Sequence, residues 1–380
     1  MIIEETAKPL RLASMLEESY DGRGNFKRYL KVYSSDDFKT AAEQMGDQPL
    51  HTERFAPFKV MEEAFRNYWA KLAGNASDVT TVELTALPKI ASGKVRELFS
   101  IDDNTLLFVT SDRISAFDIV MNNGVPQKGC LLTMLSKHWF SVLPELVPGL
   151  RTHFLATDLP VGLSDRELSC LTGRTMQVRK YKVFPLECIV RGYLTGSSWN
   201  EYMTKGTVHG IQLPRGLQQC AAIPGGPIYT PSTKAPAGLH DENIHPYQAI
   251  EMIGEQYARR IEELALKVFK AGQDYAAQRG IIIADTKFEF GLDESTDEIV
   301  LIDEVLTPDS SHMWPKNKYE PGREQESFDK EPLRKWLRAM GLEGKEGVSI
   351  PDDIALETSQ RYKDVFTLLT GQSLNTALQA

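Results

Sequence analysis

The sequence is short of the features that would place it in several large protein classes. Basic residues do not outnumber acidic ones: 43 Lys and Arg stand against 52 Asp and Glu, which gives a formal net charge of −9. A general nucleic-acid-binding protein needs a basic surface, so this balance argues against nucleic acid as a partner while allowing a local basic pocket. The longest apolar runs, such as Ile281–Ala284, are far too short to cross a bilayer, which argues against a membrane protein.

Cysteine is scarce as well. The chain has 4 cysteines and no Cys-x-x-Cys pair, which argues against a zinc or redox motif and favours reduced core thiols. The first residues include Glu4 and Glu5 and lack the apolar segment of a secretory signal, so we expect a cytoplasmic protein. The sequence also lacks the GK[ST] loop of P-loop enzymes and a dinucleotide-binding fingerprint.

The composition that is present is that of a globular protein. The 380 residues are 42% hydrophobic and 25% charged, and this length predicts two or three folding units. Residues 1–85 carry no chemical motif, and we interpret them as a packing or interface extension with a helix over residues 58–72.

Strands and helices are mixed without regular alternation, which predicts an α+β fold rather than a doubly wound parallel sheet. The expected strands are 94–100, 105–110, 174–190 (in two pieces, broken around Phe184-Pro185), 281–290 and 299–306. The expected helices are 131–143 (stopped by Pro144), 249–278 (capped by Gly280) and a final one within 351–371.

The two late strands carry many ionisable side chains. Alternation places Asp285, Lys287 and Glu289 on one face of the first strand, and Asp303 and Glu304 follow the apolar part of the second. Half-buried charges are costly unless they are paired or bind a cation, and neighbouring carboxylates commonly hold Mg²⁺. A solvated strand face with salt bridges is the alternative. Asp303 shares a face with Glu289 only if paired residue numbers sum to an even value.

Two further clusters suit phosphate groups. Ser92–Arg96 places a Gly before alternating basic residues at a strand start, which fits phosphates but equally fits an ordinary hairpin. Arg191–Ser198 is a Gly-punctuated turn rich in hydrogen-bond donors, which fits a phosphomonoester. Alternatively, Ser197 or Ser198 caps a helix that begins at Trp199, and both interpretations hold together if the helix terminus binds the anion.

A polar loop forms another candidate. Ser232–Lys234 and His240–Asn243 lie among Pro and Gly residues, and they either order around a charged small substrate or stay solvated. His240 and His245 have no third obvious ligand, which argues against zinc.

Taken in order, these strings closely resemble the SAICAR synthetase (phosphoribosylaminoimidazole-succinocarboxamide synthase) family, of the longer, yeast-like type. The match runs from about residue 86 to about residue 371, and its specificity lies in the whole series rather than in any one string. The strings are Gly93–Leu98, Ser111–Asp118, Leu186–Tyr193, Ser232–Ala235, His240–Asn243, Lys287–Gly291 and Asp303–Ser310.

The resemblance implies an enzyme of purine biosynthesis, an ATP-dependent ligase that joins L-aspartate to carboxyaminoimidazole ribotide (CAIR). The products would be SAICAR, ADP and phosphate, formed through an acyl phosphate. The implied fold is two-lobed: a β-sheet ATP-binding lobe over residues 86–190, and an α/β substrate and Mg²⁺ lobe with C-terminal helices over residues 191–380. Residues 1–85 would be an extension. The implied cofactors are ATP and Mg²⁺, and the implied partners are small molecules.

The resemblance also implies roles for individual residues. The expected ATP-binding residues are Gly93, Lys94, Val95 and Arg96 over the phosphates, Glu187 and Ile189 at the adenine, and Lys287 and Asp303. The expected metal ligands are Glu289 and Asp303. The expected substrate-binding residues are Arg191, Ser197, Lys234, Asp241 and His312. The expected catalytic residues are Lys94, Lys287 and Asp303; the chemistry needs no nucleophilic thiol, so we expect no catalytic role for Cys188.

One departure from the family concerns His312, where the family usually has Arg. His is shorter, forms no bidentate fork and is only partly charged near neutrality. Either Arg191 and neighbouring Lys316, Lys318 or Arg323 hold the ribotide phosphate, or affinity is weaker and rises as pH falls.

Two rival functions remain open at this point. A small-metabolite kinase would release ADP without aspartate. A non-catalytic nucleotide sensor would not need the carboxylate pair of Glu289 and Asp303.

Overall fold

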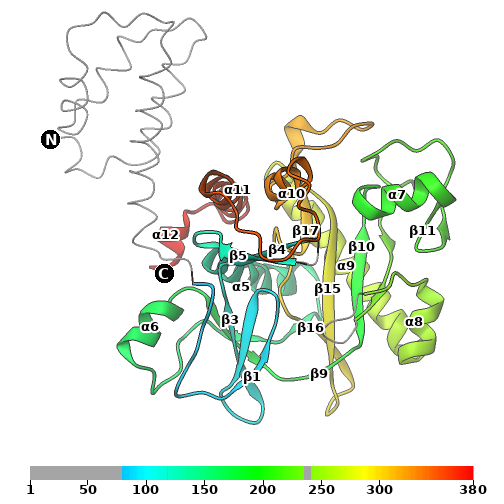
Figure 1. Cartoon of the computed structure of the whole chain (residues 1–380). Helices are drawn as coiled ribbons and strands as arrows, with labels where there is room; N and C mark the ends of the chain where they lie inside the picture. The colour runs from blue at the N-terminus through cyan, green and yellow to red at the C-terminus, as the bar shows by residue number, and fades with distance from the viewer. Residues whose placement is uncertain (1–78, 118, 235–240, 380) are drawn as a thin grey trace, which may run out of the picture. The chain divides into compact units, whose positions relative to one another are not determined.

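The computed structural model describes residues 79–117, 119–234 and 241–379, and within them it confirms the α+β class, with helices packed against two main sheets (Figure 1). Residues 1–78, which hold most of the expected extension and its helix, lie outside the described residues, as does His240. The described end of that segment packs on the first sheet through Val79, Val82 and Leu84. The division into lobes at residue 190 stays a prediction.

The first sheet has five antiparallel strands in the order β1-β2-β3-β8-β7. The expected hairpin of residues 94–100 and 105–110 is present, although its first strand begins at Arg96. Its turn is fixed by Asp102, whose carboxylate accepts from the backbone N–H of Asn104 at 2.8 Å. The strands are β1 (Lys89–Ser92), which the sequence did not predict, β2 (Arg96–Ser100), β3 (Thr105–Thr110), β7 (Phe154–Ala156) and β8 (Thr175–Arg179).

The second sheet has eight strands arranged around β15 (Ile281–Asp293), which is longer than the expected strand. One edge of β15 pairs with β10 and then β9, and the other edge with β17 and then β16. The strands around it are β6 (Arg151–Thr152), β9 (Lys182–Val183), β10 (Leu186–Arg191), β13 (Ile228–Tyr229), β14 (Ser232–Thr233), β16 (Glu298–Ile302) and β17 (Ser311–Pro315).

Two long helices build the main core with this sheet. α5 (Lys128–Leu146) runs through Pro144, which the sequence predicted as its stop; Pro144 lies in the last turn, where the Val147 N–H still closes on Leu143 at 2.8 Å. The fully buried Trp139 of α5 donates its indole N–H to the Leu306 carbonyl at 3.0 Å. The expected helix 249–278 is interrupted by Gly254 at φ 84°, giving α8 (Pro246–Ile253) and α9 (Glu255–Ala277).

The remaining helices include two that the sequence predicted and several that it did not. α7 (Gly196–Lys205) begins three residues before the expected Trp199, with Thr195 as its N-cap residue. The expected final helix is α11 (Asp352–Thr370), although α12 (Leu374–Ala377) follows it. No helix in the described part of the chain is long and apolar enough to span a bilayer. The other elements are β4 (Arg113–Ala116), β5 (Ile119–Gly124), α6 (Asp165–Leu171), β11 (Thr207–Val208), β12 (Ile211–Gln212) and α10 (Glu331–Ala339).

Candidate active site

One face of the eight-stranded sheet gathers most of the predicted polar residues. On β15 the residues Thr286, Phe288 and Phe290 are buried in the core, so alternation turns Asp285, Lys287 and Glu289 to the opposite face, as predicted. Across the antiparallel pair with β10, Asp285 lies opposite Arg191 and Lys287 opposite Ile189. The predicted side chains of both strands therefore line one surface.

Lys287 lies at the centre of this face. Its Nζ is 2.7 Å from Oε1 of Glu187 on β10 and 3.4 Å from Oε1 of Glu289. Burial lowers the pKa of Lys287, but the charges of Glu289, Glu187 and Asp303 outweigh burial and raise it. The amine is therefore a fixed cation, suited to bind an anion and unsuited to act as a base.

Lys234, which directly follows β14, reaches the neighbouring carboxylate. Lys234 forms an ion pair with Glu289. Burial raises the pKa of Glu289, but Lys287, Lys234 and Arg96 bring it below the usual value, so it is ionised. Asp241, on the other side of the loop, lies near enough to Glu187 to help burial raise the pKa of that carboxyl against the effect of Lys287.

Asp303 reaches the site by an irregular route. Glu289 pairs with Ile302, so paired numbers sum to an odd value and a regular strand would turn Asp303 to the other face. However, β16 ends at Ile302, and Asp303 adopts a left-handed backbone with φ 67°. Its carboxylate lies 2.6 Å from Nη2 of Arg96 on β2. This contact joins the two sheets at the site.

Arg96 is shared by several carboxylates. Its Nη1 lies 3.1 Å from Glu304, and although burial lowers its pKa, Asp303, Glu304 and Glu289 together raise it. The hard oxygen donors of these side chains are the kind that Mg²⁺ prefers. Among the described residues, no three His, Cys, Asp or Glu side chains form a group that could hold a metal by themselves. These carboxylates would hold Mg²⁺ only together with ligands from outside the chain, such as water.

The predicted phosphate loop, Gly93–Val95, is the turn between β1 and β2. The guanidinium of Arg113 holds this turn: it donates to the carbonyl oxygens of Gly93 at 2.9 Å and Lys94 at 3.1 Å, and to Glu97 at 2.7 Å. The sequence identified the string that contains Arg113 without giving this residue a role. Its position after the buried Asp112 is a signal that could have indicated one.

The other end of the face holds a second cationic group. Asp285 accepts from His312 Nδ1 at 2.7 Å and lies 3.3 Å from Arg191. Burial raises the pKa of Asp285, but His312 and Arg191 lower it to about 2, so Asp285 is ionised. A Cβ atom added to Gly196, the first residue of α7, would lie 4.0 Å from Cε1 of His312, so α7 begins close to this ring; the next residue, Ser197, is exposed.

Arg334 of α10 also joins this group, and the sequence did not predict it. Its Nη1 lies 3.4 Å from Nε2 of His312. The cations that the sequence suggested in its place are engaged elsewhere: Lys316 with the Ala277 carbonyl, Lys318 with Glu326 and Arg323 with Glu320. An Arg directly after Pro332 and Leu333 would have been hard to recognise because α10 itself was not predicted.

Cys188 does not face the site. It is 1% exposed, receives a hydrogen bond from Tyr229 at 3.5 Å, and burial raises its pKa to about 12. The thiol is therefore protonated and enclosed, and that it has no catalytic role stays a prediction.

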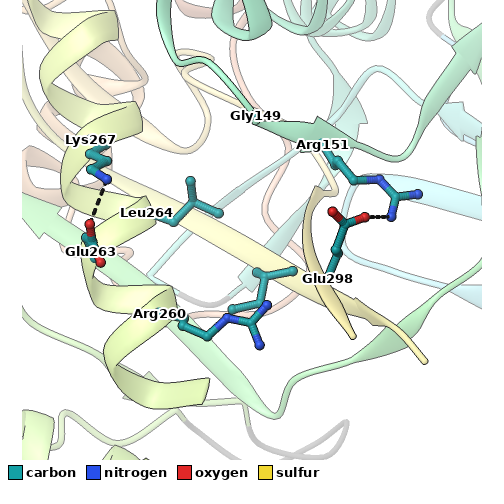
Figure 2. A pocket seen from close by; sticks show the side chains of 8 residues that line it. Gly149, Arg151, Arg260, Glu263, Leu264, Lys267 and Glu298 are labelled. Carbon is teal, nitrogen blue, oxygen red and sulfur yellow. Dashed lines mark hydrogen bonds and ion pairs between the residues drawn. The ribbon is translucent and has the colours of Figure 1, made fainter. Parts of the chain in front are cut away.

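A separate hollow of about 250 Å³ lies between α9 and the first residues of β6 and β16 (Figure 2). Arg151 there pairs with Glu298, and Lys267 pairs with Glu263 at 2.6 Å, so its charges largely compensate one another. The residues that line it include none of the predicted site residues.

Comparison with known proteins decides the family. The SAICAR synthetase family model matches residues 89–351. This chain belongs to the SAICAR synthetase family. It is thus an enzyme, a ligase of purine biosynthesis, as the order of its motifs predicted.

Yeast SAICAR synthetases are similar over nearly their whole length. The phosphoribosylaminoimidazole-succinocarboxamide synthase of Pichia angusta is 50% identical over 295 residues, which cover 76% of this chain and 96% of that protein. The Saccharomyces cerevisiae protein of the same name is 50% identical over 303 residues, covering 77% and 98%. About a quarter of this chain therefore lies outside the aligned region.

Solved SAICAR synthetases share the fold. The Saccharomyces cerevisiae enzyme in complex with SAICAR has a TM-score of 0.71 at 47% identity and covers 78% of this chain and 99% of its own. A type-2 SAICAR synthetase in complex with ADP has a TM-score of 0.56 at 28% identity, covering 75% and 99%. The SAICAR synthetase-like fold is thus confirmed.

Proposed function

We propose that this enzyme uses ATP to join L-aspartate to CAIR, releasing SAICAR, ADP and phosphate. The observation that carries the proposal is the single polar sheet face with cations at both ends and Lys287 between them. Asp285 and Glu289 are four residues apart on β15, so their backbone positions are separated by roughly 13 Å along the strand. That span suits a nucleotide triphosphate at one end and a ribotide phosphate at the other, with the reacting groups between. The SAICAR and ADP complexes of related enzymes support this choice of ligands.

We assign the ATP phosphates to the Arg96 end. The turn of Gly93, Lys94 and Val95, held by Arg113, lies beside Arg96 at the start of β2. Glu187 and Ile189 share the site face of β10 and would contact the adenine. When bound, Mg²⁺ would be held by Glu289 and Asp303 and would neutralise phosphate charge.

We assign the ribotide phosphate to the other end. Arg191, His312 and Arg334 provide positive charge there, and Ser197 lies in the first turn of α7. The Thr195 side chain makes no capping hydrogen bond, so the first amides of α7 can donate to a phosphate. Lys234 and Asp241 flank the loop that we assign to substrate binding.

The chemistry proceeds in two steps. A carboxylate oxygen of CAIR attacks the γ-phosphorus of ATP, the bond to the β–γ bridging oxygen breaks, and ADP leaves. The α-amine of aspartate then attacks the acyl carbon, phosphate leaves with the electron pair of the C–O bond, and the amine loses a proton. Lys94 and Lys287 stabilise the charge that develops on the transferred group, and Asp303 orients Arg96; positioning and electrostatics provide the catalysis.

Labelled substrate tests both the reaction and its intermediate. The enzyme is incubated with ATP, Mg²⁺, aspartate and CAIR carrying ¹⁸O in its carboxylate. We expect aspartate-dependent SAICAR and one ¹⁸O atom in each released phosphate. ADP release that is independent of aspartate would instead indicate a kinase, and unlabelled phosphate would exclude the acyl phosphate.

A further inference from the structure

His153 is the residue at which the chain passes from one sheet to the other. It follows β6 of the eight-stranded sheet and precedes β7 of the five-stranded sheet. Its backbone N–H donates to Leu301 of the large sheet at 3.0 Å, and its carbonyl accepts from Arg179 of the small sheet at 2.8 Å. The residue is 2% exposed, so both sheets meet at one buried point.

The ring of His153 extends this junction to the candidate site. Its Nε2 lies 3.2 Å from the carbonyl oxygen of Asp303. Because a carbonyl can only accept a hydrogen bond, Nε2 carries the proton in this contact. Phe108 and Phe140 pack edge-on against the ring, with centroids 5.5 and 5.4 Å away, and leave it little freedom to turn.

Asp303 needs such support. Its left-handed backbone, φ 67°, is disfavoured for a residue with a Cβ atom, and Asp is one of the few that tolerate it. This conformation redirects the carboxylate, because the odd register of β15 and β16 would otherwise turn it away from Glu289. The hydrogen bond from His153 Nε2 fixes the direction of the Asp303 carbonyl and thereby stabilises this left-handed conformation.

We propose that His153 is a positioning residue, which holds the Asp303 carbonyl so that the Asp303 carboxylate faces Arg96 across the junction of the two sheets. The inference rests on the proposed function only for the catalytic use of Asp303. Its structural part, the link between the ring and the conformation of Asp303, stands apart from the reaction.

The test compares two variants at this position with one control. His153→Phe keeps an aromatic ring between Phe108 and Phe140 but removes the donor. His153→Gln retains an N–H at the same number of bonds from the backbone. His138→Phe is the control, because it removes a partly buried histidine from α5 whose Nε2 contacts the Tyr275 hydroxyl at 3.0 Å.

Two readouts separate positioning from general stability. In His153→Phe we expect kcat for SAICAR formation to fall about 10-fold, with KM for aspartate and CAIR changed by less than about 2-fold. We also expect faster hydrogen–deuterium exchange in peptides covering residues 299–306, whereas the peptide containing the Arg179 amide stays protected because its bond to the His153 backbone remains. His153→Gln should restore both values most of the way, and His138→Phe should change neither.

Clear results would overturn the proposal. Wild-type kcat and wild-type exchange over residues 299–306 in folded His153→Phe would do so, as would equal changes in His138→Phe. If His153→Phe does not fold, His153→Gln decides alone, and a kcat below one-tenth of wild type at an unchanged Tm overturns the proposal. If wild-type protein forms no SAICAR, the proposed function has failed, and the exchange data still judge the link between His153 and Asp303.

Discussion

Asp112 and Asp303 both pair with an arginine, but their surroundings differ. Asp112 is 1% exposed and accepts from the backbone N–H groups of Val79 and Gly129, each at 2.8 Å, as well as from Arg174 at 3.1 Å. The side chain of Asp303 is 14% exposed and contacts Arg96, a side chain shared with Glu304. Asp112 is thus held mainly by backbone N–H donors, whereas Asp303 is held by the side chain of an arginine.

The kind of donor decides what each carboxylate can do. The Gly129 amide on Asp112 belongs to closely packed backbone, because an added Cβ there would lie 2.2 Å from the Thr110 carbonyl oxygen. Arg96 and the Asp303 side chain can instead exchange partners for a phosphate or a cation by rotating. We therefore expect Asp112 to serve the fold and Asp303 to serve a ligand.

Neutralising each aspartate tests this comparison. In Asp303→Asn we expect kcat/KM for SAICAR formation to fall by about 10²–10³-fold, as for other lost electrostatic contacts to a transferred group. Asn tolerates the left-handed backbone, so Tm should stay within about 2 °C of wild type. A Tm loss as large as the one expected below for Asp112 would show that the two carboxylates are alike.

Asp112→Asn should give the opposite pattern. Breaking a buried pair by neutralising one partner leaves Arg174 uncompensated, and we expect the free energy of unfolding to fall by about 3–5 kcal/mol. Urea unfolding measures this loss, and kcat per folded molecule should stay within about 2-fold of wild type. A folded but inactive Asp112→Asn protein would contradict the assignment.

The sequence predicted this site where side-chain alternation governs it. The shared face of Asp285, Lys287 and Glu289 follows from period two, and the antiparallel partner β10 extends it. Asp303 shows where such reasoning stops. The odd register excluded it from the face, and a single left-handed residue, which no periodicity records, returned it.

The missed residues have the same explanation. Arg113 and Arg334 act through contacts distant in sequence, with the Gly93 turn and with His312. Two helix boundaries were predicted wrongly. Pro144 lies inside a helix whose hydrogen bonds resume after it, with the Val147 N–H on the Leu143 carbonyl, and Gly254 divides a helix because its φ is +84°. Secondary-structure propensity contains no information on tertiary packing or on the sign of the backbone angle φ.

His312 gives an intermediate case, because it is a site residue whose charge depends on pH. Burial and Arg334 lower its pKa, but Asp285 and Asp329 together outweigh them and raise it above the usual 6.5. The raised pKa stabilises the fold fully below the unfolded value, and this contribution is lost as pH rises through the folded pKa. His312 also loses its positive charge over this pH range and would then attract the ribotide phosphate less. KM for CAIR should therefore rise about 3- to 10-fold from pH 6 to pH 8 in wild type.

His312→Arg provides the comparison for that profile, because Arg stays charged throughout. Dividing the two KM profiles removes the titration of the phosphate itself. A ratio that is constant from pH 6 to pH 8 would mean that His312 does not contact the phosphate, and Arg191 with Arg334 would then hold it without His312.

The smallest effect is expected at Cys188, one residue from a site residue. Glu187 and Cys188 are neighbours on β10, but alternation turns Glu187 toward Lys287 and Cys188 into the core. Cys188→Ser should therefore keep kcat within about 2-fold and lower the free energy of unfolding by about 1 kcal/mol, because a hydroxyl replaces a buried thiol. Glu187→Gln, the matched substitution at the neighbouring position on β10, should raise KM for ATP while preserving Tm. If Cys188→Ser lost most of its activity with the fold intact, burial and alternation would not be what separates structural from functional side chains on this sheet.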